Sequence, residues 1–434
     1  MDKIPEVAFY TLGCKLNFAE TSTIERLFAG RGFQKVGFGS RTADIVVINT
    51  CTVTASAEKK CRNIINKAVR TSPGAFVAVV GCYSQLKADN IARIPGVDIV
   101  LGSKEKFKIF EYAGDFSKNR EPLVHVGQII HEESFSPSYS LADRTRSFLK
   151  IQDGCDYFCS YCTIPLARGR SRSAKVDDIL MQAKRIEQSG VKEIVLTGVN
   201  IGDFGKPGSG GLAELLKKLE QHTNIDRIRL SSIEPDLLSD RIINFVAGSQ
   251  RFAPHFHLPL QSGCDRILEK MNRRYLTLLF TDRIKKIRSE IPDAGVGADV
   301  ITGFPGESDA DFNETYTFVK NSDIAFLHVF TYSERNNTRA ARLPGKVPPE
   351  KKESRSKLLH ALADEKLKVF HEKNVGKVHK VLFEAYNKKG RMYGFTGNYI
   401  KVEAPADEKA INRLMDAELI AVGENGVMKG LVRM

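Results

Sequence analysis

The fold of this 434-residue chain is decided by residues 148–162, FLKIQDGCDYFCSYC, where an apolar run leads into three closely spaced cysteines. The spacing is CxxxCxxC, at Cys155, Cys159 and Cys162. Three thiolates on one short loop can hold three corners of a cubane iron–sulfur cluster, which leaves its fourth iron open to another ligand. A zinc site would need a fourth protein ligand, and the loop has no histidine to provide one. The stretch therefore predicts an open-iron 4Fe-4S site that follows a strand.

The residues after this stretch continue an alternating strand and helix pattern. Six candidate strands are Phe148–Ile151, Glu193–Leu196, Arg227–Leu230, Phe256–Leu260, Gly297–Ile301 and Phe326–Phe330. Six such units predict a partial TIM-like (β/α)6 barrel, because a complete eightfold barrel typically needs about 250 residues. The CxxxCxxC loop would then lie at the carboxyl-terminal mouth, where such barrels place their chemistry. A Lys- and Glu-rich helix at Pro349–Lys373 is expected to end this core.

Three further cysteines each follow a predicted strand in residues 1–125: Cys14 after AFYTLG, Cys51 after IVVINT and Cys82 after VAVVG. Nearly continuous apolar strands alternating with helices predict a doubly wound parallel sheet. The carboxyl ends of parallel strands meet at one edge, where α/β folds bind ligands. Gly13 and Gly81 precede two of the cysteines and would let the backbone pass close to a bulky group. We therefore expect a second open-iron cluster here rather than three separately packed thiols.

The rest of the chain predicts a linker and a third domain. We expect a cluster domain at 1–125, a polar linker at 126–146, a barrel core with its helical connector at 147–370 and a small antiparallel β-barrel at 371–434. The last is indicated by short runs at Val378–Phe383, Ile400–Val402 and Leu419–Val422, separated by glycine and asparagine. Cys61 and Cys264 fit neither cysteine set, and we expect them to be inert packed thiols.

Composition and charge limit the class of protein. With 42% hydrophobic and 27% charged residues the chain is neither disordered nor collagen-like. No apolar run reaches the roughly 18 residues that span a bilayer, and the start lacks a signal-peptide pattern, so we expect a cytoplasmic protein with no membrane partner. The net charge of +13 lies outside residues 126–340, which hold 28 basic and 28 acidic residues. Basic flanks favour a nucleic acid as partner, although on charge alone a merely solubilising surface is as good an explanation.

The cysteine motifs resemble known families. CxxxCxxC after a strand that opens a six-strand α/β series resembles the radical S-adenosylmethionine (SAM) superfamily, and two three-cysteine sites followed by a small β-barrel resemble the methylthiotransferase family. The resemblance covers nearly the whole chain and identifies the tail as a TRAM module. It implies two 4Fe-4S clusters on the six cysteines, SAM as both methyl donor and radical source, and an electron donor such as flavodoxin or ferredoxin. The reaction implied is conversion of a C–H bond to C–S–CH3.

Residues around the cysteines resemble one type within that family. TLGCKLN (11–17), NTCTVT (49–54) and GCDYFCSYCTIPLARG (154–169) resemble the MtaB type, which modifies N6-threonylcarbamoyladenosine at position 37 in the tRNA anticodon stem-loop. The MiaB type, which acts on isopentenyladenosine, and the RimO type, which acts on a ribosomal-protein aspartate, show GCQMN and LGCPKN instead. An alternative from another class is a non-catalytic iron–sulfur RNA-binding protein, but it does not explain why both sites stop at three cysteines. Cys264 stands where the resemblance would place serine.

The resemblance also implies contacts with SAM and RNA. Expected SAM contacts are Tyr161, Thr197, Gly198, Asn200, Ser232, Glu234, Gln261, Asp299 and Ile301. Polar residues at barrel strand ends suit such roles, although each can instead satisfy local backbone groups. Expected RNA contacts are Arg168, Arg170 and Arg172 after the cluster loop, and Lys377, Lys380, Lys388, Lys389, Arg391, Tyr393 and Phe395 in the tail. Arginine forks match phosphate and carboxylate, and basic, aromatic-bearing small barrels commonly bind RNA; the alternative is that these charges are only solvated.

Overall fold

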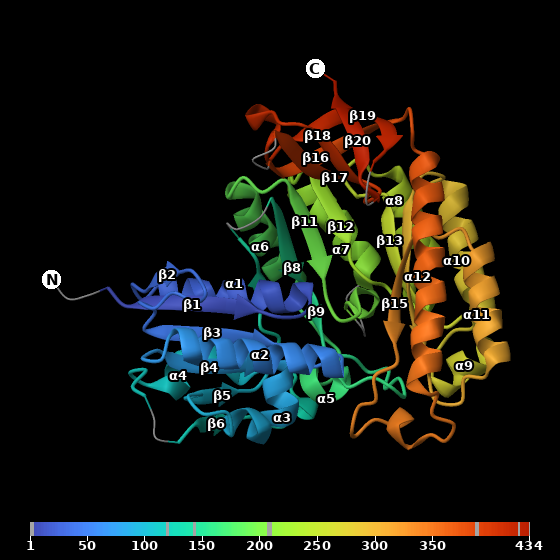
Figure 1. Cartoon of the computed structure of the whole chain (residues 1–434). Coiled ribbons are helices and arrows are strands. Elements are labelled where there is room, and N and C mark those ends of the chain that lie inside the picture. The colour runs from blue at the N-terminus through green and yellow to red at the C-terminus, as the bar shows by residue number, and fades with distance from the viewer. Residues whose placement is uncertain are drawn as a thin grey trace. The chain divides into compact units, whose positions relative to one another are not determined.

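A computed structural model of the chain describes residues 4–118, 121–141, 145–205, 211–386, 390–423 and 426–433 (Figure 1). The chain divides into two compact units. The first consists of Met1–Ser140, Phe148–Ala174 and Ser333–Thr338, and the second of Leu141–Ser147, Lys175–Tyr332 and Arg339–Met434. Both three-cysteine sets belong to the first unit.

The first unit is built on a six-stranded parallel sheet of order β2-β1-β3-β4-β5-β6. Its strands are β1 Glu6–Thr11, β2 Gln34–Val36, β3 Ile45–Thr50, β4 Phe76–Gly81, β5 Ile99–Leu101 and β6 Leu123–His125. Successive side chains point to opposite faces of a sheet, so alternate residues of a central strand belong to different apolar clusters. In β3, Val46 and Ile48 pack in one cluster, and Ile45 and Val47 pack in the other. The predicted doubly wound sheet is confirmed. The edge strands β2 and β6 escaped prediction because most of their residues are exposed and show no apolar run.

Two of the helices in this unit begin at the cysteines. The main helices are α1 Lys15–Ala29, α2 Ala55–Thr71, α3 Cys82–Ala92 and α4 Ile109–Ala113, with α5 Ile164–Arg168 after the CxxxCxxC loop. Cys14 is the N-cap of α1, and Cys82 is the first residue of α3. The stretch predicted as a linker is partly ordered, since β7 Ser138–Tyr139 pairs antiparallel with β8 Arg146–Lys150. A second short pair joins β9 Gln152–Asp153 to β10 Arg172–Ser173, on either side of the cysteine loop.

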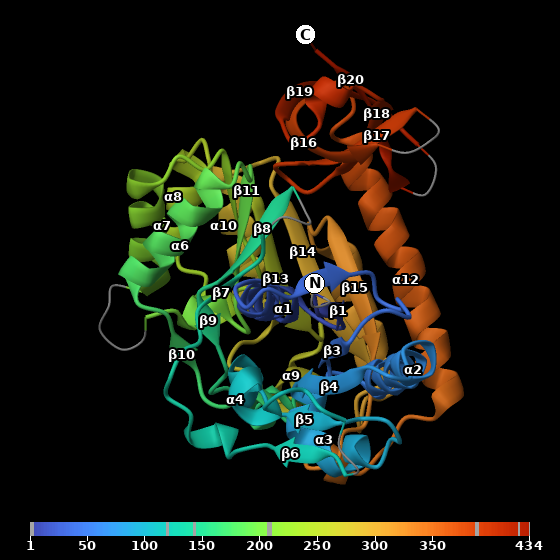
Figure 2. The ribbon, with the colours of Figure 1, turned by 90° about the vertical axis from the view of Figure 1, so that its left-hand side faces the viewer.

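The second unit carries the other five predicted core strands. They are β11 Glu193–Thr197, β12 Arg227–Leu230, β13 His255–Gln261, β14 Gly295–Thr302 and β15 Phe326–Thr331. β11 pairs parallel with β12, β13 pairs with β14 and β14 with β15, while a single parallel bridge, Ser232 to His257, joins the two groups. Helices alternate with these strands at α6 Val176–Gln188, α7 Gly211–His222, α8 Asp240–Gly248, α9 Asp265–Lys270, α10 Thr277–Glu290 and α11 Asp309–Asn321. Figure 2 shows the β13-β14-β15 sheet, with α12 beside β15.

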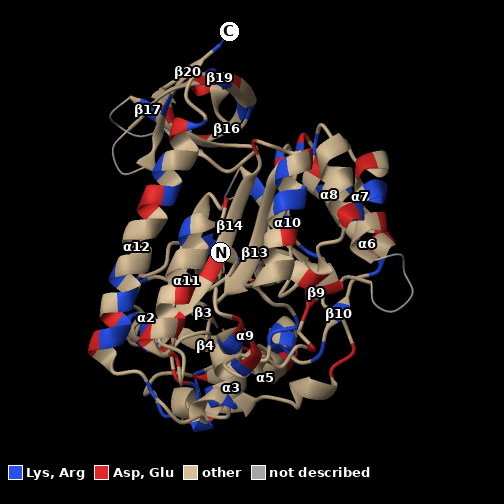
Figure 3. Cartoon of the chain, turned by 90° about the vertical axis from the view of Figure 1, so that its right-hand side faces the viewer, with Lys and Arg blue, Asp and Glu red and all other residues tan. Residues whose placement is uncertain are grey.

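The predicted connector helix is α12, Pro349–Glu372, one residue shorter than expected. Figure 3 shows both charge signs along it. Ion pairs to α11 and the loop before it anchor its start, since Arg355 contacts Glu307 and Asp309, and Lys351 contacts Asp309. None of the described helices, α12 included, is both long and apolar enough to cross a membrane.

The tail forms a closed five-stranded barrel of order β16-β17-β18-β20-β19. Its strands are β16 Val378–Tyr386, β17 Arg391–Thr396, β18 Lys401–Pro405, β19 Leu414–Val422 and β20 Met428–Val432. The barrel departs from the all-antiparallel expectation at one pair, because β18 and β20 run parallel. It lies against the starting ends of the core strands, where the Arg227 side chain donates to the carbonyl of Phe395 and that of Arg229 to the carbonyls of Thr396 and Gly397.

Candidate active site

The three cysteines that follow strands in the first 125 residues, Cys14, Cys51 and Cys82, converge at the carboxyl edge of the sheet. Burial, together with the neighbouring thiols of Cys82 and Cys14, raises the pKa of the Cys51 thiol to about 12. Polar side chains hold the three strand ends together. The Asn17 side-chain amide donates to Thr50 O at 3.0 Å, and the Thr50 hydroxyl donates to Val80 O at 2.7 Å. A thiol as resistant to ionisation as that of Cys51 loses its proton when a metal binds it. The donor set therefore suits an iron cluster better than it suits free thiolates.

Gly13 and Gly81 have the conformations that this edge needs. Gly13 has φ +105°, and a Cβ on it would lie 2.8 Å from the Cβ and 3.0 Å from the Sγ of Cys51. Gly81 has φ +99°, and a Cβ there would lie 2.3 Å from Asn49 Oδ1. Any other residue would be strained at both positions and would displace the neighbouring strand end.

A strap formed by residues 333–338, far along the sequence, contacts the loop that follows Cys51 and the start of α2. Thr52 Oγ1 donates to Glu58 Oε1 at 2.6 Å, and Arg335 donates to Thr52 Oγ1 at 2.9 Å and pairs with Glu58. The Ser333 hydroxyl accepts from the first amide of α2, that of Ala55, at 3.0 Å. Sequence reasoning missed this strap because nothing local to residues 333–338 indicates a partner nearly 280 positions away.

The CxxxCxxC loop presents its sulfurs to backbone donors. The Tyr157 amide donates to Cys155 Sγ at 3.5 Å, and the Ile164 amide donates to Cys162 Sγ at 3.4 Å. The loop is closed by the Cys155 amide, which donates to Gly169 O at 3.0 Å. Amide hydrogen bonds to cysteine sulfur favour the thiolate form and are a usual feature of iron–sulfur sites.

A buried charged network lies beside both cysteine sets. It is centred on Glu20 of α1, whose carboxylate contacts Lys106 at 2.6 Å, Lys150 at 2.9 Å and Arg168 at 3.0 Å. Asp153, two residues before Cys155, also contacts Lys150 and Arg168, at 2.7 and 3.0 Å. Burial alone would raise the pKa of Glu20, but Arg168, Lys106 and Lys150 together hold that pKa well below its usual range. The five charges sum to +1.

Arg168 joins this network to the first cysteine set. Its guanidinium donates to Asn17 Oδ1 at 2.7 Å, and the same oxygen faces Cys14 Sγ at 3.9 Å. Burial opposes its charge, but Cys82, Glu20 and Asp153 raise the pKa of Arg168 well above the usual value. The prediction that Arg168 contacts substrate RNA is wrong, because its side chain is only 2% exposed and its donors are already engaged within the protein.

The other two arginines of this run differ from Arg168. Arg170 is exposed, lying over the Phe158 ring and 3.6 Å from Asp156. Arg172 is largely covered and donates to Ser134 O and Asp153. Of the three, Arg170 is the most accessible to an RNA phosphate.

The expected SAM contacts in the second unit lie at or near the carboxyl ends of its core strands. Thr197 ends β11, Gln261 ends β13 in a left-handed conformation (φ 67°), and Gly198 and Asn200 follow β11. The Asn200 amide donates to Asp203 Oδ2 at 3.1 Å. Tyr161 belongs to the cysteine loop of the first unit. The positions suit the predicted roles, which stay predictions.

Glu234, another expected SAM contact, is a carboxyl group of unusual basicity. It pairs with Arg273, and its side chain is 16% exposed. Burial raises its pKa to about 7, despite Arg273, and Asp236 and Asp203 add to the effect. Its charge state therefore changes close to neutral pH.

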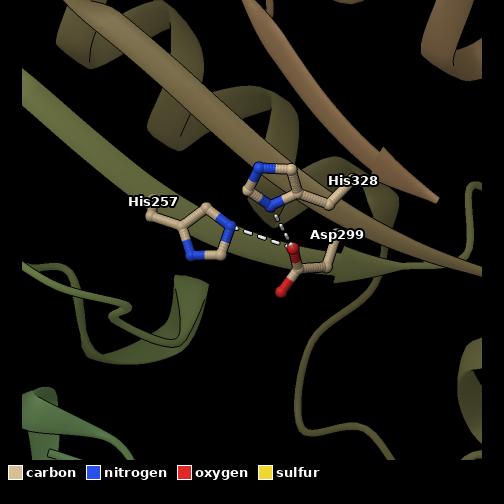
Figure 4. Close-up of side chains that lie close together, drawn as sticks. All are labelled: His257, Asp299 and His328. Atoms are coloured by element: carbon tan, nitrogen blue, oxygen red, sulfur yellow. Dashed lines mark hydrogen bonds and ion pairs between the residues drawn. The ribbon is translucent and has the colours of Figure 1, made fainter. Parts of the chain in front are cut away.

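Ser232 and Asp299 are already engaged by histidines that sequence reasoning missed. His257 Nδ1 lies 2.6 Å from Ser232 Oγ, and His257 Nε2 lies 3.0 Å from Asp299 Oδ1. His328 Nδ1 lies 3.0 Å from the same Asp299 oxygen. Figure 4 shows the two rings converging on this carboxylate from the strands on either side. Asp299 and Ile301 share the less buried face of β14, between the fully buried Ala298, Val300 and Thr302.

The tail residues expected to meet RNA have partners within the protein. Lys377 pairs with Asp293 at 2.6 Å, Lys380 with Asp416 at 3.3 Å, and Arg391 with Glu403 at 3.8 Å. The Tyr393 hydroxyl donates to Glu403, and the Phe395 ring stacks on Tyr399 with the Arg146 guanidinium 4.8 Å from its centroid. Lys388 and Lys389 lie outside the described residues. The exposed lysines remain candidates, whereas Phe395 has its ring engaged by neighbouring side chains.

The two remaining cysteines are buried, as expected. Cys61 lies against Cys51: its thiol donates to Cys51 O at 3.3 Å, and burial raises its pKa to about 11. Cys264 is 1% exposed and its thiol donates to Asp311 Oδ1 at 3.4 Å. Burial raises the pKa of Cys264 to about 12.

Two family models match the chain. One, described as the radical SAM superfamily, matches residues 149–319, and the other, described as uncharacterized protein family UPF0004, matches residues 6–102. Membership of the radical SAM superfamily implies a 4Fe-4S cluster and SAM. The first match contains the CxxxCxxC loop, and the second contains the three cysteines of the N-terminal sheet.

Relatives with assigned functions align with almost the whole chain. The threonylcarbamoyladenosine tRNA methylthiotransferase MtaB of Bacillus subtilis is 38% identical over 427 residues, covering 96% of this chain and 94% of the relative. The protein of the same name from Aquifex aeolicus is 37% identical over 400 residues, covering 92% and 96%. A tRNA-2-methylthio-N(6)-dimethylallyladenosine synthase of Syntrophus aciditrophicus is 32% identical over 392 residues, covering 88% and 84%.

A solved structure supports the fold. The radical SAM methyltransferase TsrM from Kitasatospora setae, with cobalamin and a 4Fe-4S cluster bound, superposes with a TM-score of 0.53, covering 76% of this chain and 75% of that chain. At 14% sequence identity this likeness concerns the fold alone. It confirms the predicted radical-SAM-like core. The parallel-sheet domain and the closed barrel are seen in the structure itself.

Proposed function

The chain belongs to the MtaB type of radical-SAM tRNA methylthiotransferases, and we propose that it converts N6-threonylcarbamoyladenosine at position 37 of tRNA to its 2-methylthio derivative. The observation that carries the proposal is the pairing of two three-cysteine sites within one compact unit, in a chain that aligns over nearly its full length with enzymes of that name.

We propose that each cysteine set holds one 4Fe-4S cluster: Cys155, Cys159 and Cys162 the SAM-binding cluster, and Cys14, Cys51 and Cys82 a second one. When bound, these groups supply one-electron reductive cleavage of SAM at the first site and a place for sulfur at the second. The donor sets fit, because both are three-thiol sets, the loop amides donate to Cys155 and Cys162, and Gly13 leaves space beside Cys51.

The chain's own residues hold these two sites in a fixed relation. Glu20 ties the helix that follows Cys14 to Lys150 and Arg168, which flank the CxxxCxxC loop in sequence. Because every group in this network is buried and paired, a shift of one segment would leave a charge without its partner, at a cost of several kcal/mol. The network therefore positions both cysteine sets.

Residues that contact SAM and tRNA are assigned from the family resemblance and from their positions in the fold. We assign SAM to Tyr161 and to the strand-end groups Thr197, Gly198, Asn200, Ser232, Glu234, Gln261, Asp299 and Ile301. For tRNA the accessible basic groups are Arg170, Lys377, Lys380 and Arg391, and we also assign it Tyr393 and, from the sequence, Lys388 and Lys389. The electron would come from a donor such as flavodoxin or ferredoxin, in the cytoplasm. The domain boundaries 1–125, 147–370 and 371–434, with a linker between the first two, complete the proposal.

The cluster assignment predicts separable losses. Anaerobic reconstitution should give roughly eight irons per chain, falling to roughly four in Cys155→Ala and in Cys51→Ala. Cys155→Ala should also abolish SAM cleavage, whereas Cys51→Ala should leave cleavage intact and stop sulfur insertion. Cys264→Ala, which lies outside both sets, is the matched control and should keep all irons. Loss of SAM cleavage in Cys51→Ala would argue against separate roles.

The substrate assignment is tested by mass spectrometry of tRNA nucleosides from cells with and without this gene. We expect the 2-methylthio form of threonylcarbamoyladenosine to disappear with the gene and to return with the wild-type copy. An unchanged pool of that nucleoside, together with a changed isopentenyladenosine derivative or ribosomal-protein aspartate, would move the chain to another type of the family.

A further inference from the structure

Three neighbouring strands of the second unit place two imidazoles and one carboxylate around a common point. In the sheet register, Asp299 of β14 lies opposite His328 of β15 and next to Pro259 of β13. His257 lies two residues earlier on β13, and its Nε2 nevertheless reaches the Asp299 oxygen at 3.0 Å (Figure 4). One ligand atom from each of the three residues lies within 4.8 Å of the other two.

Gly297 makes this convergence possible. It is the register partner of His257, and a Cβ at Gly297 would lie 3.1 Å from His257 Cδ2. The absence of a side chain therefore lets the imidazole lie across β14 toward Asp299. His328 needs no such space, because it pairs directly with Asp299 in the register.

Ser232 fixes which nitrogen of His257 faces the carboxylate. Its hydroxyl lies 2.6 Å from Nδ1, so Nε2 is left to point at Asp299. A histidine whose second nitrogen is held by a hydrogen bond is the usual arrangement around metal ions, because that bond sets the tautomer and the orientation of the ring.

From this geometry we propose that His257, Asp299 and His328 form a binding site for a divalent first-row transition metal ion such as Zn²⁺. Two imidazoles and one carboxylate are the protein ligands of open catalytic zinc sites and of non-haem Fe(II) sites. Ligand atoms about 2.0–2.1 Å from a tetrahedral ion lie about 3.3 Å apart, close to the 3.0 Å that separates Asp299 Oδ1 from each imidazole nitrogen. Three ligands leave at least one coordination position open.

The accessible side of the site indicates what the open position would bind. His328 is 61% exposed, whereas Asp299 and His257 are 20% and 16% exposed. A divalent ion with one carboxylate and two neutral imidazoles keeps a net charge of +1, which favours an anionic oxygen as the next ligand. If the proposed function holds, that ligand is the threonine carboxylate of the modified adenosine. The metal would then distinguish the modified base from plain adenosine.

The test measures zinc bound by the cluster-loaded enzyme, since unloaded cysteine sites would themselves take zinc. Wild type, His328→Ala and His360→Ala are equilibrated anaerobically with buffered Zn²⁺, and zinc and iron per chain are counted by mass spectrometry. His360 is an exposed histidine of α12 and serves as the matched control. We expect about one zinc in wild type and in the control, and at least tenfold weaker binding in His328→Ala, with iron unchanged. Because His328 is exposed, its replacement should leave the fold intact, and the unchanged iron content checks this.

A second variant and a tRNA measurement complete the test. Ser232→Ala should weaken zinc affinity by roughly 10- to 100-fold, the usual effect of removing a hydrogen bond that orients a metal-binding histidine. Zinc-loaded wild type should prefer tRNA with threonylcarbamoyladenosine over tRNA with adenosine, and His328→Ala should bind both equally. Equal zinc in wild type and His328→Ala would overturn the metal site. Zinc binding by wild type with the same tRNA preference in wild type and His328→Ala would overturn only the carboxylate contact. Failure of the proposed function would be seen separately, because wild-type enzyme would then not methylthiolate tRNA that carries threonylcarbamoyladenosine.

Discussion

Replacing Glu20 with glutamine should destabilise the first unit far more than its position outside both cysteine sets would indicate. Glu20 is the shared partner of Lys106, Lys150 and Arg168, all of them buried. Lys150 and Arg168 would keep Asp153 after the substitution. Lys106 has no other carboxylate among the contacts of the described residues, so its charge is the one left without a counterion.

The size of the effect follows from that single buried charge. Removing one partner of a buried ion pair typically costs about 3–5 kcal/mol. Lys106 could avoid this cost only by losing its proton, and neutralising a lysine of ordinary pKa at pH 7 costs about 4.6 kcal/mol. Burial already lowers the pKa of Lys106 despite Glu20, which favours loss of the proton, and the cost of that route, about 4.6 kcal/mol, falls within the range of the first. We therefore expect Glu20→Gln to cost the first unit about 3–5 kcal/mol.

Hydrogen exchange is the appropriate assay, because the chain has no tryptophan to report unfolding by fluorescence. Amides of α1 and β8 should exchange roughly 150- to 5,000-fold faster in Glu20→Gln, which is the fold-change that corresponds to this free energy. Glu25→Gln on the same helix is the matched control: Glu25 pairs with the half-exposed Lys35 and should change exchange less than about fivefold. Comparable exchange in the two variants would refute the account of the network.

The pH dependence of stability gives an independent check on Glu20. Its pKa in the folded protein is held below the usual value by Arg168, Lys106 and Lys150, against the effect of burial. The unfolded chain therefore binds the proton more readily, and the stabilisation is complete above the ordinary glutamate pKa of about 4.3. It is lost as pH falls from there through the lowered pKa. Wild type should lose protection in α1 on acidification, and Glu20→Gln should lose less of it.

Three further outcomes are expected. Gly13→Ala should reduce iron from roughly eight to roughly four per chain, because the added Cβ would collide with Cys51. Gly32→Ala is the control and should keep all irons, because Gly32 also has a positive φ but has no atom within 4 Å of an added Cβ. SAM affinity should rise as pH increases through about 7, where Glu234 ionises and becomes a better acceptor for ribose hydroxyls; titration of Glu234→Gln should show no such step, and an unchanged step would refute the contact. Neutralising Lys388 and Lys389 should weaken tRNA binding and flatten its salt dependence while SAM cleavage is unchanged; equal salt slopes would remove the tail from the RNA interface.

The sequence predicted the architecture where burial leaves a strong pattern. The central strands β3 and β4 are buried at every residue and contain the apolar runs IVVI and FVAVV. The edge strands β2 and β6 are largely exposed and carry no such run. The tail illustrates another limit: its strands were recognisable, but the parallel pairing of β18 with β20 depends on barrel closure, which no local pattern encodes.

The candidate site was predictable as far as it depends on residue type and spacing. Cysteines at strand ends are visible in the sequence, and so are the glycines before two of them. The partners of those residues are not, because Glu20 meets Lys106 and Lys150 across 86 and 130 positions. Arg168 shows the consequence, since an arginine in a short basic run is typical of a phosphate contact, yet here it is buried against Glu20 and Asp153. His257 and His328 carried no motif and became recognisable only through the register with β14.

The Glu20 network also determines how variants of this enzyme are to be interpreted. Its carboxylate connects the helix after Cys14 to the strand before Cys155 and to the helix after Cys162. On the proposed cluster assignment, replacing a cysteine affects its own cluster first, whereas a change at Glu20 displaces segments that belong to both cysteine sets. Partial loss of iron from both sites at once, in a variant that has lost no thiol, is therefore the signature of this network. Loss confined to one site would mean that the two cysteine sets are positioned independently, and that the buried charges serve only the stability of the unit.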